Sequence, residues 1–155
     1  MIVLFLYLLA LGCWLGAVVF FSFVTAPAVF INLPIAEAGK VIGAIFPRYY
    51  LVGYIAGAIA VVLAIYLTIS ASNRGWWSVT ALGLAIALGL TFYAGLVILP
   101  RADSLRHVAE ESNPDPAQKS EFDHLHSLSV YLNGAVLLLD LWAVLGTAGA
   151  LSGRG

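Results

Sequence analysis

The chain has 155 residues, of which 62% are hydrophobic and 10% are charged, with a formal net charge of −1 at pH 7. Soluble domains carry about 25% charged residues, so the composition excludes a soluble domain, and the lack of a basic excess excludes a nucleic-acid partner. The single Cys13 excludes a disulfide-stabilised secreted scaffold. We therefore interpret the chain as an integral membrane protein.

Four runs of the sequence are long and apolar enough to cross a bilayer, which takes about 20 residues. They cover residues 1–36, 49–73, 75–100 and 127–153, and Asp140 is the only charged residue in them. We predict an all-α fold with a single transmembrane domain. In this prediction, an integral membrane four-helix bundle is formed by helices at about residues 2–30, 49–72, 76–108 and 116–149.

The segment between the first two runs is expected to form a short amphipathic helix at the membrane interface. Pro34 suits the first turn of a helix and Pro47 its end. Glu37 and Lys40 are spaced for an i,i+3 pair, and the apolar residues of the segment share one face. This interfacial helix would separate helix one from helix two.

The most polar stretch of the chain predicts a turn and the start of helix four. Residues 111–116 are expected to form the core of the turn, in which Asp115 and Pro116, with Gln118 after them, match a variant of the capping box. A helix from there to about residue 149 is on the order of 50 Å long, which exceeds the hydrocarbon core of about 30 Å. Helices three and four should therefore protrude together as a hairpin.

The distribution of basic residues predicts the orientation in the membrane. The side with the termini and the connection between helices two and three holds Arg74 and Arg154. The other side holds five basic residues: Lys40, Arg48, Arg101, Arg106 and Lys119. Because cytoplasmic loops carry the excess of Lys and Arg, both termini are predicted to be non-cytoplasmic. Trp76 and Trp77, beside Arg74, are expected to lie in an interfacial aromatic belt.

Two pairs of glycines predict close contacts between helices. Gly12 and Gly16 in helix one, and Gly53 and Gly57 in helix two, have the spacing of small-xxx-small motifs. We interpret both pairs as packing within the bundle, and a homo-oligomer interface is the alternative.

Polar side chains enter the fourth apolar run at helical spacing. His126, Ser129, Asn133 and Asp140 stand at i, i+3, i+7 and i+14, so a helix aligns them along one stripe. Such a stripe faces protein or water and avoids lipid. If Asp140 lies near mid-bilayer, His126 is about 21 Å away along the axis and therefore interfacial.

Two arginines are predicted to join the stripe at the same end of the molecule. Arg48 at the start of helix two and Arg101 at the end of helix three lie on the side of His126. Together with residues 25–32 they are expected to form a polar cleft that leads toward Asn133.

Each of these polar residues also has a purely structural interpretation. Arg48 and Arg101 suit interfacial anchors, and Ser129 and Asn133 suit interhelical hydrogen bonding. Asp140 is either a proton or cation site or a hydrogen-bonding group that holds a neighbouring helix. The sequence leaves these alternatives open.

Signatures of cofactors and of enzymes are missing from the sequence. Bis-histidine haem ligation needs a second histidine deep in another helix, and the first three predicted helices hold none within the membrane. His124 and His126 are i,i+2 and point about 200° apart on a helix, so they cannot bind one metal together. We expect no cofactor and no metal. An enzyme is the third functional class that we consider: His126 could act as a general acid or base, but no nucleophile or cofactor signature accompanies it.

Four blocks of residues stand in a family-like order and spacing: Phe20-Phe21-Ser22-Phe23-Val24 leading to Phe30, then Ile45 to Tyr50, then Leu99-Pro100-Arg101, then Phe122 with His126-Ser127-Leu128-Ser129 and Asn133. Across essentially the whole chain they resemble the transmembrane protein 205-like family. The resemblance implies a small four-helix protein of unknown function in a bacterial inner membrane. The motif positions that the resemblance implies are Phe46, Pro47, Tyr49, Pro100, Arg101, His126, Ser129 and Asn133. Asp140 is not among them.

The sequence thus predicts a small transport or ligand-binding module that holds a cation, a proton or an amphiphile in a polar cleft at the cytoplasmic side. The alternative is a structural or assembly subunit that acts through helix contacts with a membrane partner. The expected partners are the lipid bilayer and either a second copy of the chain or a membrane protein. The predicted cleft residues are Arg48, Arg101, His126, Ser129, Asn133 and Asp140.

Overall fold

The computed structural model describes residues 1–71, 74–109 and 115–152, and the regular structure in these ranges is helical. The helices form four continuous rods, each long and apolar enough to cross a membrane. The first rod comprises α1 (Ile2–Phe20), the π-helical turn η1 (Phe21–Thr25) and α2 (Ala26–Asn32); the second is α3 (Ile35–Ser70); the third comprises α4 (Arg74–Tyr93), the π-helical turn η2 (Ala94–Ile98) and α5 (Leu99–Ala109); the fourth is α6 (Pro116–Ser152).

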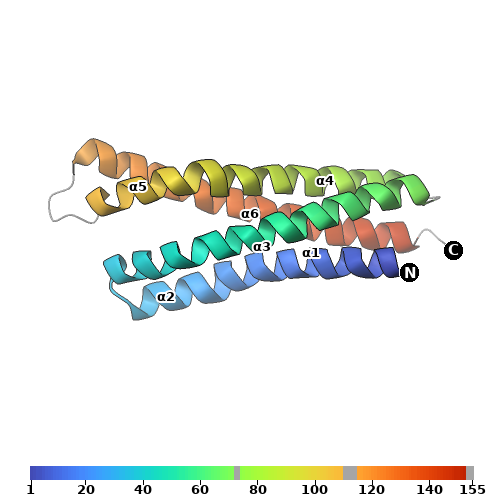
Figure 1. Ribbon diagram of the computed structural model, residues 1–155, viewed down its shortest axis with the longest axis horizontal. Helices are drawn as coiled ribbons and strands as arrows, with labels where there is room; N and C mark the ends of the chain where they lie inside the picture. The colour runs from blue at the N-terminus through green and yellow to red at the C-terminus, as the bar shows by residue number, and fades with distance from the viewer. Residues whose placement is uncertain (72–73, 110–114, 153–155) are drawn as a thin grey trace.

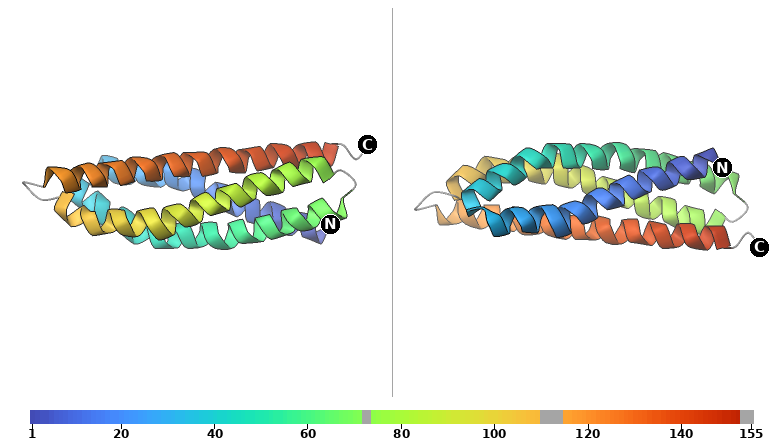
Figure 2. Two further views of the ribbon diagram at one scale, coloured as in Figure 1. Left: turned by 90° about the horizontal axis from the view of Figure 1, so that it is seen from above. Right: turned by 90° about the horizontal axis from the view of Figure 1, so that it is seen from below.

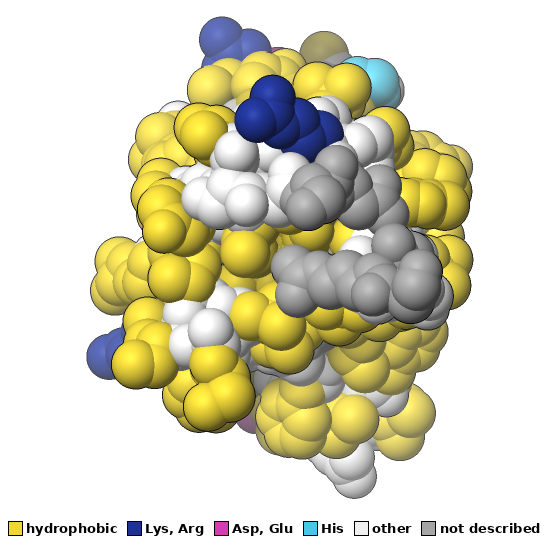
Figure 3. Space-filling model, turned by 90° about the vertical axis from the view of Figure 1, so that its right-hand side faces the viewer, with side chains coloured by type: hydrophobic (Ala, Val, Ile, Leu, Met, Phe, Trp, Pro, Cys, Tyr) yellow, Lys and Arg dark blue, Asp and Glu magenta, His cyan; other side chains and the backbone are white. Residues whose placement is uncertain are grey.

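The four rods lie side by side, and both chain termini are at the same end (Figures 1 and 2). α4 packs on α3 and α6, and α1 packs on α3. At the opposite end α2 packs on α3 and α5 packs on α6, and Figure 1 shows these two pairs diverging. The end that carries the termini presents mostly hydrophobic side chains and few charged ones (Figure 3).

The interior combines large aromatic side chains with small residues. Trp14 and Trp77 are almost completely buried, and small residues such as Ala60 and Ala87 belong to the same core cluster. Trp77 is fully buried against Tyr7, with ring centroids 5.5 Å apart. The prediction that Trp77 lies in an interfacial belt is therefore wrong, because this ring fills the space between α1 and α4.

The two glycine pairs differ in their surroundings. Gly53 and Gly57 let α3 approach α1, and a Cβ on Gly57 would lie 2.9 Å from the Trp14 ring. This confirms intramolecular packing for that pair. A Cβ on Gly12 or Gly16 would meet no atom within 4 Å, so packing within the bundle is wrong for the pair in α1.

The predicted interfacial helix is not a separate element. α3 runs without interruption from Ile35 to Ser70 and includes Pro47. A proline inside a helix removes one backbone hydrogen bond and crowds the carbonyl four residues earlier. Pro47 leaves the Gly43 carbonyl without its helical donor, and α3 nevertheless continues through it. Pro47 is therefore an interior residue of the helix, which it does not end.

The other two interior prolines follow π-helical turns. η1 ends at Thr25, two residues before Pro27, and η2 ends at Ile98, two residues before Pro100. A π turn adds an extra residue to the helix, which moves the crowded carbonyl away from the proline ring. The two bulges thus let the first and third rods continue through their prolines.

The fourth rod begins where the capping pattern predicts. The backbone N–H of Ala117 donates to the Asp115 carboxylate at 3.3 Å, and α6 starts at Pro116. Its first turns extend beyond the ends of α2 and α3 (Figure 1). Of the turn predicted at residues 111–116, residues 111–114 lie outside the described residues.

Candidate functional site

A cavity of about 590 Å³ lies at the end where the α2–α3 pair and the α5–α6 pair diverge. All four rods contribute side chains to it, and α6 lines it from Lys119 to Asn133. These two residues are 14 positions apart, which corresponds to about 21 Å along the helix axis. The cavity is therefore long, and it runs roughly parallel to the rods.

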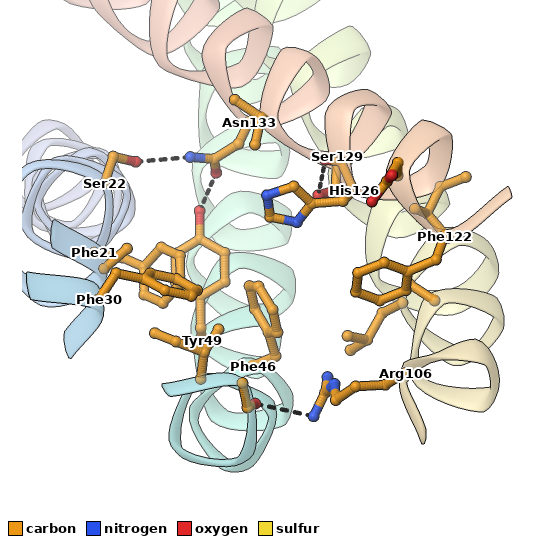
Figure 4. Close-up of a pocket in the computed structure, with 18 of the residues that line it drawn as sticks. Phe21, Ser22, Phe30, Phe46, Tyr49, Arg106, Phe122, His126, Ser129 and Asn133 are labelled. Atoms are coloured by element: carbon orange, nitrogen blue, oxygen red, sulfur yellow. Dashed lines mark hydrogen bonds between the residues drawn. The ribbon is translucent and has the colours of Figure 1, made fainter. Parts of the chain in front are cut away.

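Aromatic side chains form one wall of the cavity (Figure 4). The ring of Phe21 packs against the ring of Tyr49 at 4.7 Å and against that of Phe46 at 5.3 Å, measured between centroids. Phe46 also stacks on Tyr50 at 5.9 Å. These rings come from η1 and α3, and they give the cavity an apolar surface.

A hydrogen-bonded cluster closes the deep end of the cavity. The hydroxyl of Tyr49 donates to Oδ1 of Asn133, and Nδ2 of Asn133 donates to Oγ of Ser22 at 2.7 Å (Figure 4). Ser22 belongs to η1, so the π turn before Pro27 helps to bring it to this position. The cluster joins the first, second and fourth rods through neutral polar groups.

Arg106 spans the cavity near its open end. Its Nη1 donates to the Gly39 carbonyl at 3.0 Å, and its Nη2 pairs with Asp103 at 3.0 Å. A Cβ on Gly43 would overlap the guanidinium, so Gly39 and Gly43 form a notch on α3 that receives it. An arginine has five N–H donors, and these two contacts leave others for a bound molecule.

Three of the predicted cleft residues line the cavity, namely His126, Ser129 and Asn133. The imidazole of His126 is exposed and stacks on Phe122, with centroids 6.3 Å apart. The Ser129 hydroxyl donates to the His126 carbonyl at 2.7 Å. The stripe is thus open to the cavity at its outer end and hydrogen-bonded to neighbouring rods at Asn133.

The other three predicted residues do not line this cavity. Arg48 and Arg101 are exposed, and the guanidinium of Arg48 donates a hydrogen bond to the Ala44 carbonyl. Asp140 is fully buried, two helical turns deeper than Asn133. The cavity therefore brings together the outer half of the stripe without the two arginines.

Sequence reasoning did not select Ser22 or Arg106 for the cleft. Ser22 is placed by the π turn before Pro27, and Pro27 is the signal that the sequence offers for it. Arg106 reaches α3 because Gly39 and Gly43 stand four residues apart, and this small-residue spacing is visible in the sequence. The sequence analysis also did not include Thr147 in the polar stripe of the fourth helix, although Thr147 continues the heptad spacing of His126, Asn133 and Asp140 by one further step.

Comparison with known proteins gives one match. Residues 9–111 fit the family model described as a domain of unknown function, DUF4149. No curated protein and no solved structure matches the chain. These comparisons give no support for the transmembrane protein 205-like resemblance.

Proposed function

We propose from the geometry of the site that this chain, which belongs to the DUF4149 family of unknown function, is a membrane ligand-binding module for a single-chain amphiphile. In this proposal the four rods cross the membrane as a bundle, and the start of α6 protrudes with α5. The observation that carries the proposal is the elongated cavity with apolar walls and polar groups along α6. Its volume of about 590 Å³ lies within the usual range for small-molecule sites.

The walls of the cavity favour a hydrocarbon chain as the buried part of the ligand. Phe21, Phe30 and Phe46 are only partly covered by other side chains, so their rings remain available for contact. Transfer of apolar surface from water into such a site contributes about 25 cal/mol per Å². An acyl chain entering along the rods would also match the elongated shape of the cavity.

The polar groups favour a head group near the open end. Arg106, Lys119 and His126 line this part of the cavity, and Asp123 is paired with Lys119 at 2.9 Å. The donors of Arg106 and the exposed His126 ring are suited to oxygen atoms of a head group. The amphiphile would therefore lie with its polar group beside α5 and α6 and its chain toward Asn133.

Binding is tested with palmitate that carries an anthroyloxy fluorophore, added to the purified protein in detergent. We expect saturable binding by the wild-type protein. Ala26→Trp, which fills the cavity, should abolish it, whereas Ala28→Trp should bind as wild type because Ala28 lies on the same helix, is exposed and does not line the cavity.

The polar end is tested in the same assay. Arg106→Gln should weaken binding by about tenfold, as expected for the loss of one hydrogen bond to a charged group, and His126→Ala should weaken it as well. Equal binding by Ala26→Trp and Ala28→Trp, or no saturable binding by the wild type, would overturn the proposal. Either result would favour the alternative function as a structural subunit.

A further inference from the structure

Asp140 is a buried carboxyl that the proposed ligand cavity does not use. Its side chain is 0% exposed, and neither carboxyl oxygen has a hydrogen-bond partner among the described residues. No ion pair to it is formed in that part of the chain either. An exposed acid is surrounded by solvent, whereas the carboxyl group of Asp140 is surrounded by protein.

Asp140 lies between two polar clusters on the same face of α6. Asn133, one heptad before it, is bonded to Tyr49, and Thr147, one heptad after it, is bonded to Tyr7 at 2.9 Å. Seven residues correspond to about 10.5 Å along the helix axis.

Among the described residues, the elements around Asp140 bury no compensating positive charge. α1 contains no acidic or basic residue, and the buried residues of α3 include none. The titratable groups of the two flanking clusters are Tyr7 from α1 and Tyr49 from α3. The buried residues of α4 are Trp77, Thr80, Ala81, Gly83, Leu84, Ala87 and Thr91, and none of them is acidic or basic. The indole N–H of Trp77 is itself buried without a partner.

An ionised carboxylate without a partner is too costly to keep in such an interior. The simplest occupant that removes this cost is a proton, since it needs no further ligands from the protein. We propose that Asp140 is a proton-binding site inside the bundle, loaded and unloaded from the ligand cavity through the Asn133–Tyr49 cluster. The exchange is a proton transfer between the carboxyl and water, and no bond other than O–H forms or breaks.

The route follows from the position of the cavity. Asn133 and Tyr49 line the cavity, and Asn133 is the cavity residue of α6 nearest to Asp140 along the helix, about 10.5 Å from it. In this proposal a chain of several waters, each bridging its neighbours, carries the proton across that gap. Ionisable residues inside membranes commonly act in proton relays. This inference does not depend on the ligand, because it requires only that water reaches the deep end of the cavity.

Infrared spectroscopy of the reconstituted protein across a pH series tests the site. We expect a C=O band of a protonated carboxyl at neutral pH, where the exposed acids are ionised, and reversible loss of the band in alkaline buffer. Asp140→Asn, which keeps the size and shape of the side chain, should lack the band. A wild-type spectrum identical to that of Asp140→Asn, or a band that never titrates, would overturn the proposal.

Exchange into heavy water tests the route. Asn133→Leu should slow the deuterium shift of the carboxyl band severalfold, whereas Tyr7→Phe, which removes one hydrogen bond on the far side of Asp140, should leave the rate unchanged. Slowing by Tyr7→Phe alone, or by neither variant, would overturn entry from the cavity. Palmitate binding by the same variants shows whether the cavity is intact, so failure of the ligand proposal is recognised separately.

Discussion

At the scale of single residues, similar side chains on α6 have opposite surroundings. The amide of Asn133 is matched by the hydroxyls of Tyr49 and Ser22, whereas the carboxyl of Asp140 has no hydrogen-bond partner among the described residues. Neutral hydroxyls can pair with both the oxygen and the nitrogen of an amide, but a carboxylate needs charged or multiple donors. Asn133 therefore contributes both to helix packing and to the cavity, whereas packing alone does not explain the buried Asp140.

The glycines of α1 and α3 provide the clearest test at this scale. Gly57→Ala places a methyl group 2.9 Å from the Trp14 ring and from Leu88 Cδ1. Because Trp14 is rigidly packed, we expect a loss of about 1–3 kcal/mol in the free energy of unfolding, as for overpacked cores. Denaturant unfolding in detergent measures it.

The matched control is Gly12→Ala, which adds a methyl group with no neighbour within 4 Å. Its helix propensity should raise stability by up to about 1 kcal/mol. A Gly57→Ala protein as stable as Gly12→Ala would contradict the close contact between α3 and Trp14.

At the scale of elements, three interior prolines are accommodated in two ways. Pro27 and Pro100 follow π-helical turns, and Pro47 stands in a regular helix without such a turn. The π turns also border the cavity, because Ser22 of η1 and Ile98 of η2 line it. Prolines thus shape the end of the molecule where the candidate site lies.

Replacement of Pro47 tests this account of α3. Pro47→Ala restores the backbone N–H that the Gly43 carbonyl lacks, so we expect α3 to be stabilised by up to about 3 kcal/mol. Pro34→Ala, at the N-cap of α3, should change stability little because no interior hydrogen bond is missing there. Thermal unfolding in detergent compares the two. A destabilised Pro47→Ala variant would contradict this account of α3.

The sequence predicts the elements better than their contacts. Apolar runs and the Asp115 cap locate α6 because hydropathy and capping are local signals. The continuity of α3 through Pro47 could not be predicted, since it depends on how the disturbed carbonyls are satisfied. The same holds for Ser22 and Arg106, because their roles arise from neighbours that are 111 and 67 positions away in the chain.

At the scale of the whole molecule, the two ends differ in charge as well as in shape. The cavity opens at the end formed by α2, α5 and the starts of α3 and α6, and five basic residues belong to this side of the chain. The end with the termini carries two basic residues in the sequence and a mostly hydrophobic surface (Figure 3). This asymmetry connects the location of the site to the orientation of the protein.

Reporter fusions test the orientation. Since cytoplasmic segments retain the excess of Lys and Arg, alkaline phosphatase fused after the last residue should be active in bacterial cells, and a green fluorescent protein fusion there should be dark. Replacing Lys40, Arg101 and Lys119 by glutamine leaves two basic residues on each side. We expect this variant to insert in both orientations, because the charge difference that selects one of them is gone. An inactive phosphatase fusion together with a fluorescent green fluorescent protein fusion would place the cavity on the non-cytoplasmic side, and proton loading of Asp140 would then draw on that compartment.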